Sequence, residues 1–214
     1  MDDQKAQSGR TLSKAEKERS EIFAKVTSDL ESRGYSKKDL TVSTVKANVL
    51  GTLAGVIVAS PIAAAFLITG GIQTFSDSPV ALMIMFPAFV LSIVVHELLH
   101  GTGWAIFAKN GFKNIAFGVV WSALMPYCTC KVPLRKGPYI LGLVLPLIIL
   151  GIIPGILACV FGSYALLIYG LLMTVCAGGD LLVLFLIIRS HLKGDVLFLD
   201  HPTDVGLVGF VKES

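Results

Sequence analysis

Two histidines four residues apart, with a glutamate beside the first, are the residues of this sequence best suited to chemistry. Residues 95–101 read VHELLHG. On a helix, His96 and His100 would lie one turn apart on one face, where both imidazoles can bind a single metal ion. Zinc suits imidazole and carboxylate ligands, and three protein ligands leave one position open for water. Glu97, about 100° round the helix from His96, could take a proton from that water without being a ligand.

Asp180 is the strongest candidate for the third ligand. It is the only Asp, Glu, Lys, Arg or His between residues 137 and 188. Counted from the ends of the two apolar segments that carry them, Asp180 lies about 14 Å, and His96 and His100 about 18 and 12 Å, from the same membrane surface. The three groups are therefore expected at matching depth. The alternatives are a polar cluster without metal, and an Asp180 that pairs with a hydroxyl group or a lysine.

Other potential ligands lie outside these segments. Cys128 and Cys130 could offer thiolates from a turn, or they could be ordinary thiols in a loop. His201 and Asp204, near the C-terminus, could approach the metal. The pair His201-Pro202 is more typical of a turn, and we expect one there.

The composition indicates a membrane protein. Hydrophobic residues make up 54% of the 214 residues and charged residues only 15%, whereas soluble domains carry about 25% charged residues. Residues 47–76, 78–95 and 137–179 contain no charged residue. Apolar runs longer than about 18 residues are typical of transmembrane helices, which excludes a soluble globular domain.

We therefore predict an all-α integral membrane protein with four transmembrane helices. The first runs from about residue 48 to 70 and the second from about 80 to 108. Residues 137–188 are long enough for two more, joined near Phe161 to Ser163. Residues 1–47 would form a cytoplasmic amphipathic segment, 48–189 the membrane core, and 190–214 a cytoplasmic tail with a possible strand at 196–199.

Two segments outside the apolar runs have a predicted role. Leu12, Ala15, Ile22, Phe23, Val26 and Leu30 recur at helical spacing. They indicate an amphipathic helix that rests on the rest of the protein or on the lipid surface. Residues 114–130 are free of charge but have basic residues on both sides. We expect a re-entrant loop or a hairpin there, rather than a fifth transmembrane helix.

The basic residues predict the orientation. With four transmembrane helices, all eighteen Lys and Arg residues fall on one side. That side should be the cytoplasm, with both termini inside. The basic residues form no single patch, which excludes nucleic acid as a partner and leaves the lipid bilayer.

Several stretches carry a family resemblance. They read GY at 34–35, DLTV at 39–42, HELLHG at 96–101, PYCTCKVPL at 126–134, GIIP at 151–154, GDLL at 179–182 and DHP at 200–202. Together they resemble a family of bacterial multi-pass membrane proteins described as zincin peptidases. That family is itself similar to the site-two protease clan of intramembrane zinc metalloproteases. Site-two proteases typically have Leu-Asp-Gly around the aspartate, whereas Leu181 follows Asp180 here.

The resemblance implies a zinc-dependent peptidase of the bacterial inner membrane that cleaves membrane or juxtamembrane proteins. By it, His96, His100 and Asp180 are the zinc ligands and Glu97 is the catalytic carboxylate. A helical substrate must unwind locally to expose its carbonyl groups, and residues 114–131 could offer a strand edge to the extended stretch. The rival interpretation is a non-enzymatic zinc-binding membrane protein, such as a sensor, a chaperone or a permease component.

Overall fold

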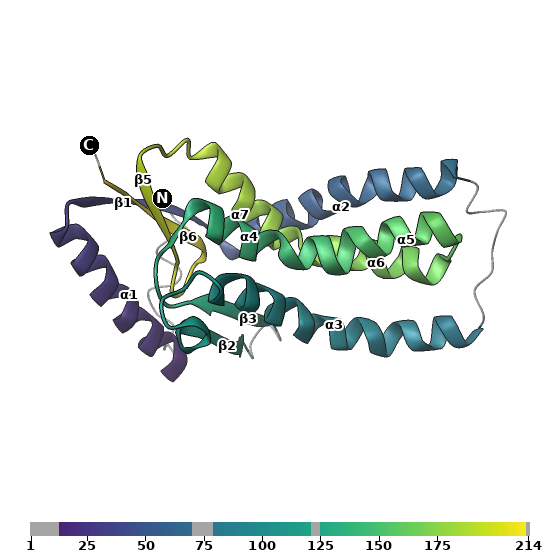
Figure 1. Ribbon diagram of the computed structural model, residues 1–214, viewed down its shortest axis with the longest axis horizontal. Coiled ribbons are helices and arrows are strands. Elements are labelled where there is room, and N and C mark those ends of the chain that lie inside the picture. The colour runs from purple at the N-terminus through teal and green to yellow at the C-terminus, as the bar shows by residue number, and fades with distance from the viewer. Residues whose placement is uncertain (1–12, 70–78, 121–124, 213–214) are drawn as a thin grey trace.

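A computed structural model describes residues 13–69, 79–120 and 125–212. Long helices run alongside one another, and a β-sheet, a β-hairpin and the first helix gather at one end of them (Figure 1). The predicted turn after the first transmembrane helix falls mainly on residues 70–78, outside the described residues.

Three helical stretches are long and apolar enough to cross a membrane. They are α2 (Thr44–Ile68), α3 (Pro79–Ala105) and the continuous stretch Lys136–Phe161. A fourth candidate is a pair of helices, α6 (Tyr164–Cys176) and α7 (Gly178–Arg189), bent by 47° at their junction. The structure thus confirms a mainly helical chain with three or four candidate transmembrane helices, and it breaks the predicted fourth helix in two.

The stretch Lys136–Phe161 is built from three parts. Helix α4 (Lys136–Pro146) passes into the π-helical turn η3 (Leu147–Ile152) and then into α5 (Ile153–Phe161). Gly162, with a φ of 63°, ends α5 in the left-handed conformation that glycine adopts without strain. The chain therefore reverses at the predicted place, between residues 161 and 164.

The prediction of an all-α protein is wrong, because a four-stranded antiparallel sheet caps one end of the helices. Its strands lie in the order β1 (Tyr35–Val42), β6 (Val205–Lys212), β5 (Asp195–Asp200) and β4 (Leu134–Arg135). Strand β1 pairs with β6 from Tyr35 opposite Lys212 to Val42 opposite Val205. The strand expected at residues 196–199 is part of β5, and the strands on either side of it in the sheet were missed.

The amphipathic helix is α1 (Lys14–Ser32), and it rests on this sheet. It begins with a capping box in which the Ser13 hydroxyl group accepts from the Glu16 amide and the Glu16 carboxylate accepts from the Ser13 amide. Its Leu30 joins a buried apolar cluster with Tyr35, Leu199, Val208 and Phe210. Of the two surfaces considered for this helix, the protein's own sheet is therefore the one that it covers.

A β-hairpin occupies residues 115–130. Strands β2 (Ile115–Val120) and β3 (Met125–Cys130) pair antiparallel, with Ile115 opposite Cys130. Strand β3 packs against α3. Of the two forms predicted for this segment, the hairpin is the one found, and it lies beside the helix that carries the two histidines (Figure 1).

Candidate metal centre

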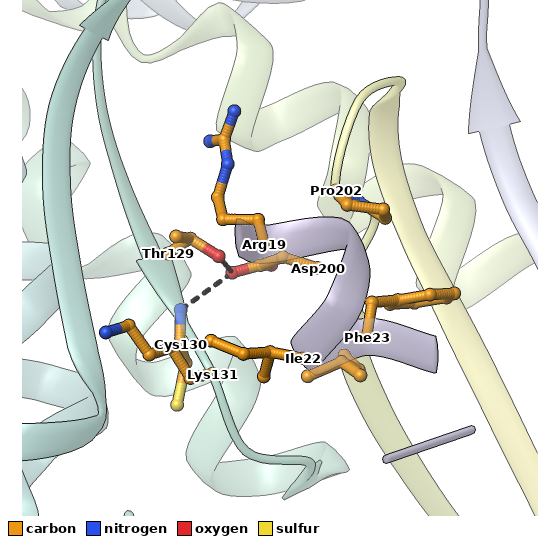
Figure 2. A pocket seen from close by; sticks show the side chains of 9 residues that line it. Arg19, Ile22, Phe23, Thr129, Cys130, Lys131, Asp200 and Pro202 are labelled. Atoms are coloured by element: carbon orange, nitrogen blue, oxygen red, sulfur yellow. Dashed lines mark hydrogen bonds between the residues drawn. The ribbon is translucent and has the colours of Figure 1, made fainter. Parts of the chain in front are cut away.

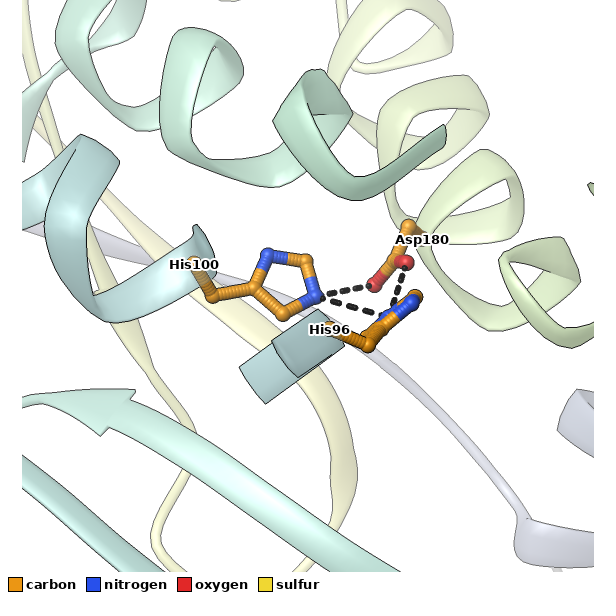
Figure 3. A group of neighbouring side chains, drawn as sticks. All are labelled: His96, His100 and Asp180. Carbon is orange, nitrogen blue, oxygen red and sulfur yellow. Dashed lines mark hydrogen bonds and ion pairs between the residues drawn. The ribbon is translucent and has the colours of Figure 1, made fainter. Parts of the chain in front are cut away.

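The structure brings His96, His100 and Asp180 together (Figure 3). The Nε2 atoms of His96 and His100 are 3.1 Å apart. The Asp180 carboxylate places Oδ2 3.1 Å from His96 Nε2 and Oδ1 3.3 Å from His100 Nε2. Helix α3 supplies the two imidazoles and the first turn of α7 supplies the carboxylate. The expected convergence of the three groups is thus found, although α7 is a separate helix.

The spacing of these atoms fits a tetrahedral zinc ion. Zn–N and Zn–O bonds of about 2.0–2.2 Å separate the ligand atoms of a tetrahedron by roughly 3.3–3.6 Å. The imidazole nitrogens are 3.1 Å apart, and each lies 3.1 or 3.3 Å from a different oxygen of Asp180, which is close to that range. One ligand atom from each of the three residues lies within 4.8 Å of the others. The imidazoles are almost fully buried, with exposed fractions of 9% for His96 and 5% for His100. Two imidazoles and a carboxylate in a dry position are donors that zinc prefers, so the residues fit this ion.

Contacts behind His100 fix its orientation. Its Nδ1 lies 2.9 Å from the carbonyl oxygen of Gly142 in α4. A carbonyl group only accepts, so Nδ1 carries the proton and Nε2 keeps its lone pair for a metal. The Trp104 ring stacks on the imidazole, with ring centroids 5.3 Å apart, and its indole N–H donates to the Tyr139 carbonyl group at 3.0 Å. The sequence does not reveal that Gly142, Trp104 and Tyr139 support His100, because their contacts form only when α4 packs against α3.

Glycines let the helices that carry the site approach closely. A Cβ atom at Gly103 in α3 would lie 2.6 Å from the Gly142 Cα atom in α4. A Cβ atom at Gly178 in α7 would lie 2.1 Å from the Gly51 carbonyl oxygen in α2. Small residues at such crossings allow backbone-to-backbone packing within membranes. His100 and Asp180 each lie within three residues of a glycine at one of these crossings. The two crossings therefore fix the positions of His100 and Asp180 along the helix bundle.

Glu97 is half-buried beside the three donors and is not one of them. Its carboxyl group interacts electrostatically with His96, His100 and Asp180. The backbone amide of Cys128 in β3 also faces this carboxyl group. Glu97 therefore lies close to both the metal centre and the hairpin, where a carboxylate could exchange a proton with a water molecule at the metal.

The competing ligands lie elsewhere. Among the residues that the structure describes, the donor cluster consists of His96, His100 and Asp180. Burial raises the pKa of both Cys128 and Cys130, that of Cys130 to about 12, which disfavours their thiolate forms. The Cys130 thiol group donates to the Val132 carbonyl oxygen.

The second set of competing ligands forms the turn between β5 and β6. The His201 Nδ1 atom accepts from the Asp204 amide at 2.9 Å, and the His201 ring packs edge-on against Phe23 of α1. The turn predicted at His201 and Pro202 is therefore confirmed.

One family model matches the chain. Its description is "Putative zincin peptidase", and the match covers residues 89–193. That range includes His96, Glu97, His100 and Asp180, together with the hairpin and helices α4 to α7. No curated protein and no solved structure matches the chain significantly. The match supports a zincin-like peptidase family for this chain, and with it a zinc cofactor.

Proposed function

We propose that the chain is a zinc-dependent metallopeptidase embedded in the membrane, with His96, His100 and Asp180 as its zinc ligands and Glu97 as its catalytic carboxylate. The observation that carries the proposal is the clustering of two imidazoles and a carboxylate from two separate helices, with one ligand atom from each residue within 4.8 Å of the others. The family match over these residues supports the same activity.

The reaction would be hydrolysis of a peptide bond. A zinc ion held by these ligands would act as a Lewis acid on the scissile carbonyl group and make a water molecule acidic enough to attack near neutral pH. Glu97 would take the proton from the attacking water and pass it to the leaving amine. The two imidazoles are buried, and the Gly142 carbonyl group accepts a hydrogen bond from His100. Both features would hold the donors in place during the reaction.

The substrate would be a membrane or juxtamembrane protein, presented as an extended stretch. Strand β3 lies beside the Glu97 side chain, so an extended peptide that passed alongside the hairpin would bring its carbonyl groups near the metal centre. It would not pair with β3 at Cys128 or Cys130, whose outward amides already face Glu97 and Asp200. The long apolar helices are compatible with a multi-pass membrane protein. We propose the bacterial inner membrane as its location, with the hairpin and sheet on the cytoplasmic side.

Metal analysis of the purified protein tests the proposal. We expect about one zinc ion per chain in the wild type and a loss of zinc in His96→Ala and in Asp180→Ala, because two remaining donors bind weakly. His191→Ala, which removes an exposed histidine outside the cluster, is the matched control and should keep its zinc. A wild-type protein that binds no zinc, or variants that keep it, would remove the basis of the proposal.

A further inference from the structure

Asp200, the last residue of β5, is bonded to two other elements. Its Oδ2 atom accepts from the Cys130 amide and from the Thr129 hydroxyl group, each at 2.9 Å (Figure 2). Its Oδ1 atom accepts from the Tyr139 hydroxyl group in the first turn of α4. A carboxylate with three donors is held firmly, and in turn it holds the strand and the helix that supply those donors.

The first of these elements, strand β3, connects Asp200 with Glu97. The Lys131 amide donates to the Asn114 carbonyl group across the hairpin, so the amides of Cys130 and Cys128 point away from β2. Asp200 accepts from the first of these two amides, and the Glu97 carboxyl group faces the second. Two carboxylates therefore meet consecutive outward amides on the same edge of β3, and the position of Asp200 determines where that edge meets Glu97.

The second element, helix α4, connects Asp200 with His100. The carbonyl group of Tyr139 accepts from Trp104, whose ring stacks on His100. One turn further along α4, the Gly142 carbonyl group accepts from His100 itself. Asp200 accepts a hydrogen bond from the Tyr139 side chain and so fixes the turn of α4 that contains Tyr139 and Gly142. The carbonyl group of Tyr139 holds Trp104 against His100, and the carbonyl group of Gly142 contacts His100 directly.

We propose that Asp200 is a positioning residue for the zinc centre, which it places by joining β3 and α4 so that Glu97 and His100 face the same point. This inference rests on the proposed function of that site. Asp200 forms hydrogen bonds to β3 and α4 and interacts with His100 only through space, by its charge. Its effect on the position of Glu97 and His100 therefore passes through the two elements.

The test compares Asp200→Asn with Asp195→Asn in the full-length protein. Asp195 lies at the other end of β5 and also accepts from a tyrosine hydroxyl group, that of Tyr35, which makes it a matched control. An asparagine at 200 has one acceptor oxygen and cannot accept from all three donors. We expect cobalt(II) to bind about 10- to 100-fold more weakly to Asp200→Asn, with an altered visible absorption spectrum, and to bind Asp195→Asn as it does wild type.

Two further measurements separate positioning from a general loss of structure. Tyr139→Phe removes one donor and leaves β3 bonded to Asp200. It should weaken cobalt binding while Tyr35→Phe does not. In metal-free protein, the Cys128 amide should exchange its hydrogen faster in Asp200→Asn than in Asp195→Asn, although Asp200 does not touch it.

The outcomes are distinct. Unchanged cobalt binding and unchanged exchange in Asp200→Asn, or equal effects in Asp195→Asn, would overturn the inference. A wild-type protein that binds no cobalt would count against the proposed function. The exchange measurement needs no metal, so it would still decide whether Asp200 holds β3 against Glu97.

Discussion

At the scale of single residues, the arrangement of His96, His100 and Asp180 requires a proton or a metal ion between the donor atoms. The Gly142 carbonyl group accepts a hydrogen bond from the Nδ1–H of His100, so in the neutral imidazole the lone pair of Nε2 faces the cluster. That lone pair lies 3.1 Å from His96 Nε2 and 3.3 Å from a carboxylate oxygen. Three electron-rich atoms at this separation repel one another unless a proton or a metal ion lies between them.

Glu97→Gln separates a peptidase from a non-enzymatic zinc-binding protein. Glutamine has nearly the shape of glutamate but cannot accept a proton, and Glu97 is not a metal donor. We expect zinc content to stay at the wild-type level while cleavage of the substrate falls by about 100- to 10,000-fold. The measurement compares zinc per chain and substrate processing in cells. Glu31→Gln, an exposed residue of α1, is the control.

Full cleavage by Glu97→Gln would end the peptidase proposal. It would leave a sensor, a chaperone or a permease component, because such proteins need the ligands but not a proton acceptor beside them.

At the scale of elements, the sequence predicted the helices better than the strands, for a physical reason. Apolar runs long enough for a membrane are visible locally, and so is the spacing of His96 and His100. Strand β1 buries mainly Tyr35 and has four exposed residues in succession, so it carries no clear alternation. Its partner β6 lies more than 160 residues away. The break between α6 and α7 was equally hidden, because both halves are apolar and one turn residue, Ala177, separates them.

The crossing of α2 and α7 should control metal binding. In Gly178→Ala the new methyl group would meet the Gly51 backbone, so the two helices must separate and carry Asp180 away from the imidazoles. We expect a lower zinc content and a loss of about 1–3 kcal/mol of stability. Gly179→Ala is the matched control, since a Cβ atom there meets nothing within 4 Å. Zinc analysis measures the zinc content and thermal unfolding measures the stability of each variant. Equal zinc content and equal stability of Gly178→Ala and Gly179→Ala would contradict the role of this crossing.

The packing of α1 on the sheet should depend on pH through His201. Burial lowers the pKa of His201 below its ordinary 6.5, and Lys37 lowers it further, against Asp204 and Asp39, which raise it. The unfolded chain therefore binds the proton more readily than the folded one. Stability from this group is present above pH 6.5 and is lost as the pH falls through the lower, folded-state pKa.

Hydrogen exchange of α1 at about pH 7.5 and about pH 5.5, corrected for the intrinsic rate, measures this effect. We expect weaker protection at the lower pH in the wild type, because the His201 ring contacts Phe23 of α1. The difference should vanish in His201→Gln and persist in the control His191→Gln. Equal protection of wild-type α1 at both pH values would show that the histidine does not govern this contact.

At the scale of the whole molecule, the sheet restricts how the chain crosses the membrane. Strand β1 precedes α2, β4 lies between α3 and α4, and β5 follows α7, yet all three belong to one sheet. A sheet with open edges cannot lie across lipid, so these strands must be on one side. An even number of crossings must then separate β4 from β5. If the stretch from α4 to α5 is one crossing, the bent pair α6 and α7 would be the other, and we therefore predict four crossings in total.

Cysteine labelling tests this inference in a variant whose four native cysteines are replaced. Ser36→Cys in β1, Asn110→Cys after α3 and Lys193→Cys before β5 introduce thiols at exposed positions before the first, after the second and after the fourth proposed crossing. A membrane-impermeant maleimide should reach all three from the cytoplasmic side only, because the sheet must lie on one side and the basic residues predict that this side is the cytoplasm. Phe161→Cys, at the exposed end of α5, should react only from the opposite side. Labelling of positions 36 and 193 from opposite sides would require an odd number of crossings, and the pairing of β1 with β6 across the ends of the chain could then not exist in the membrane.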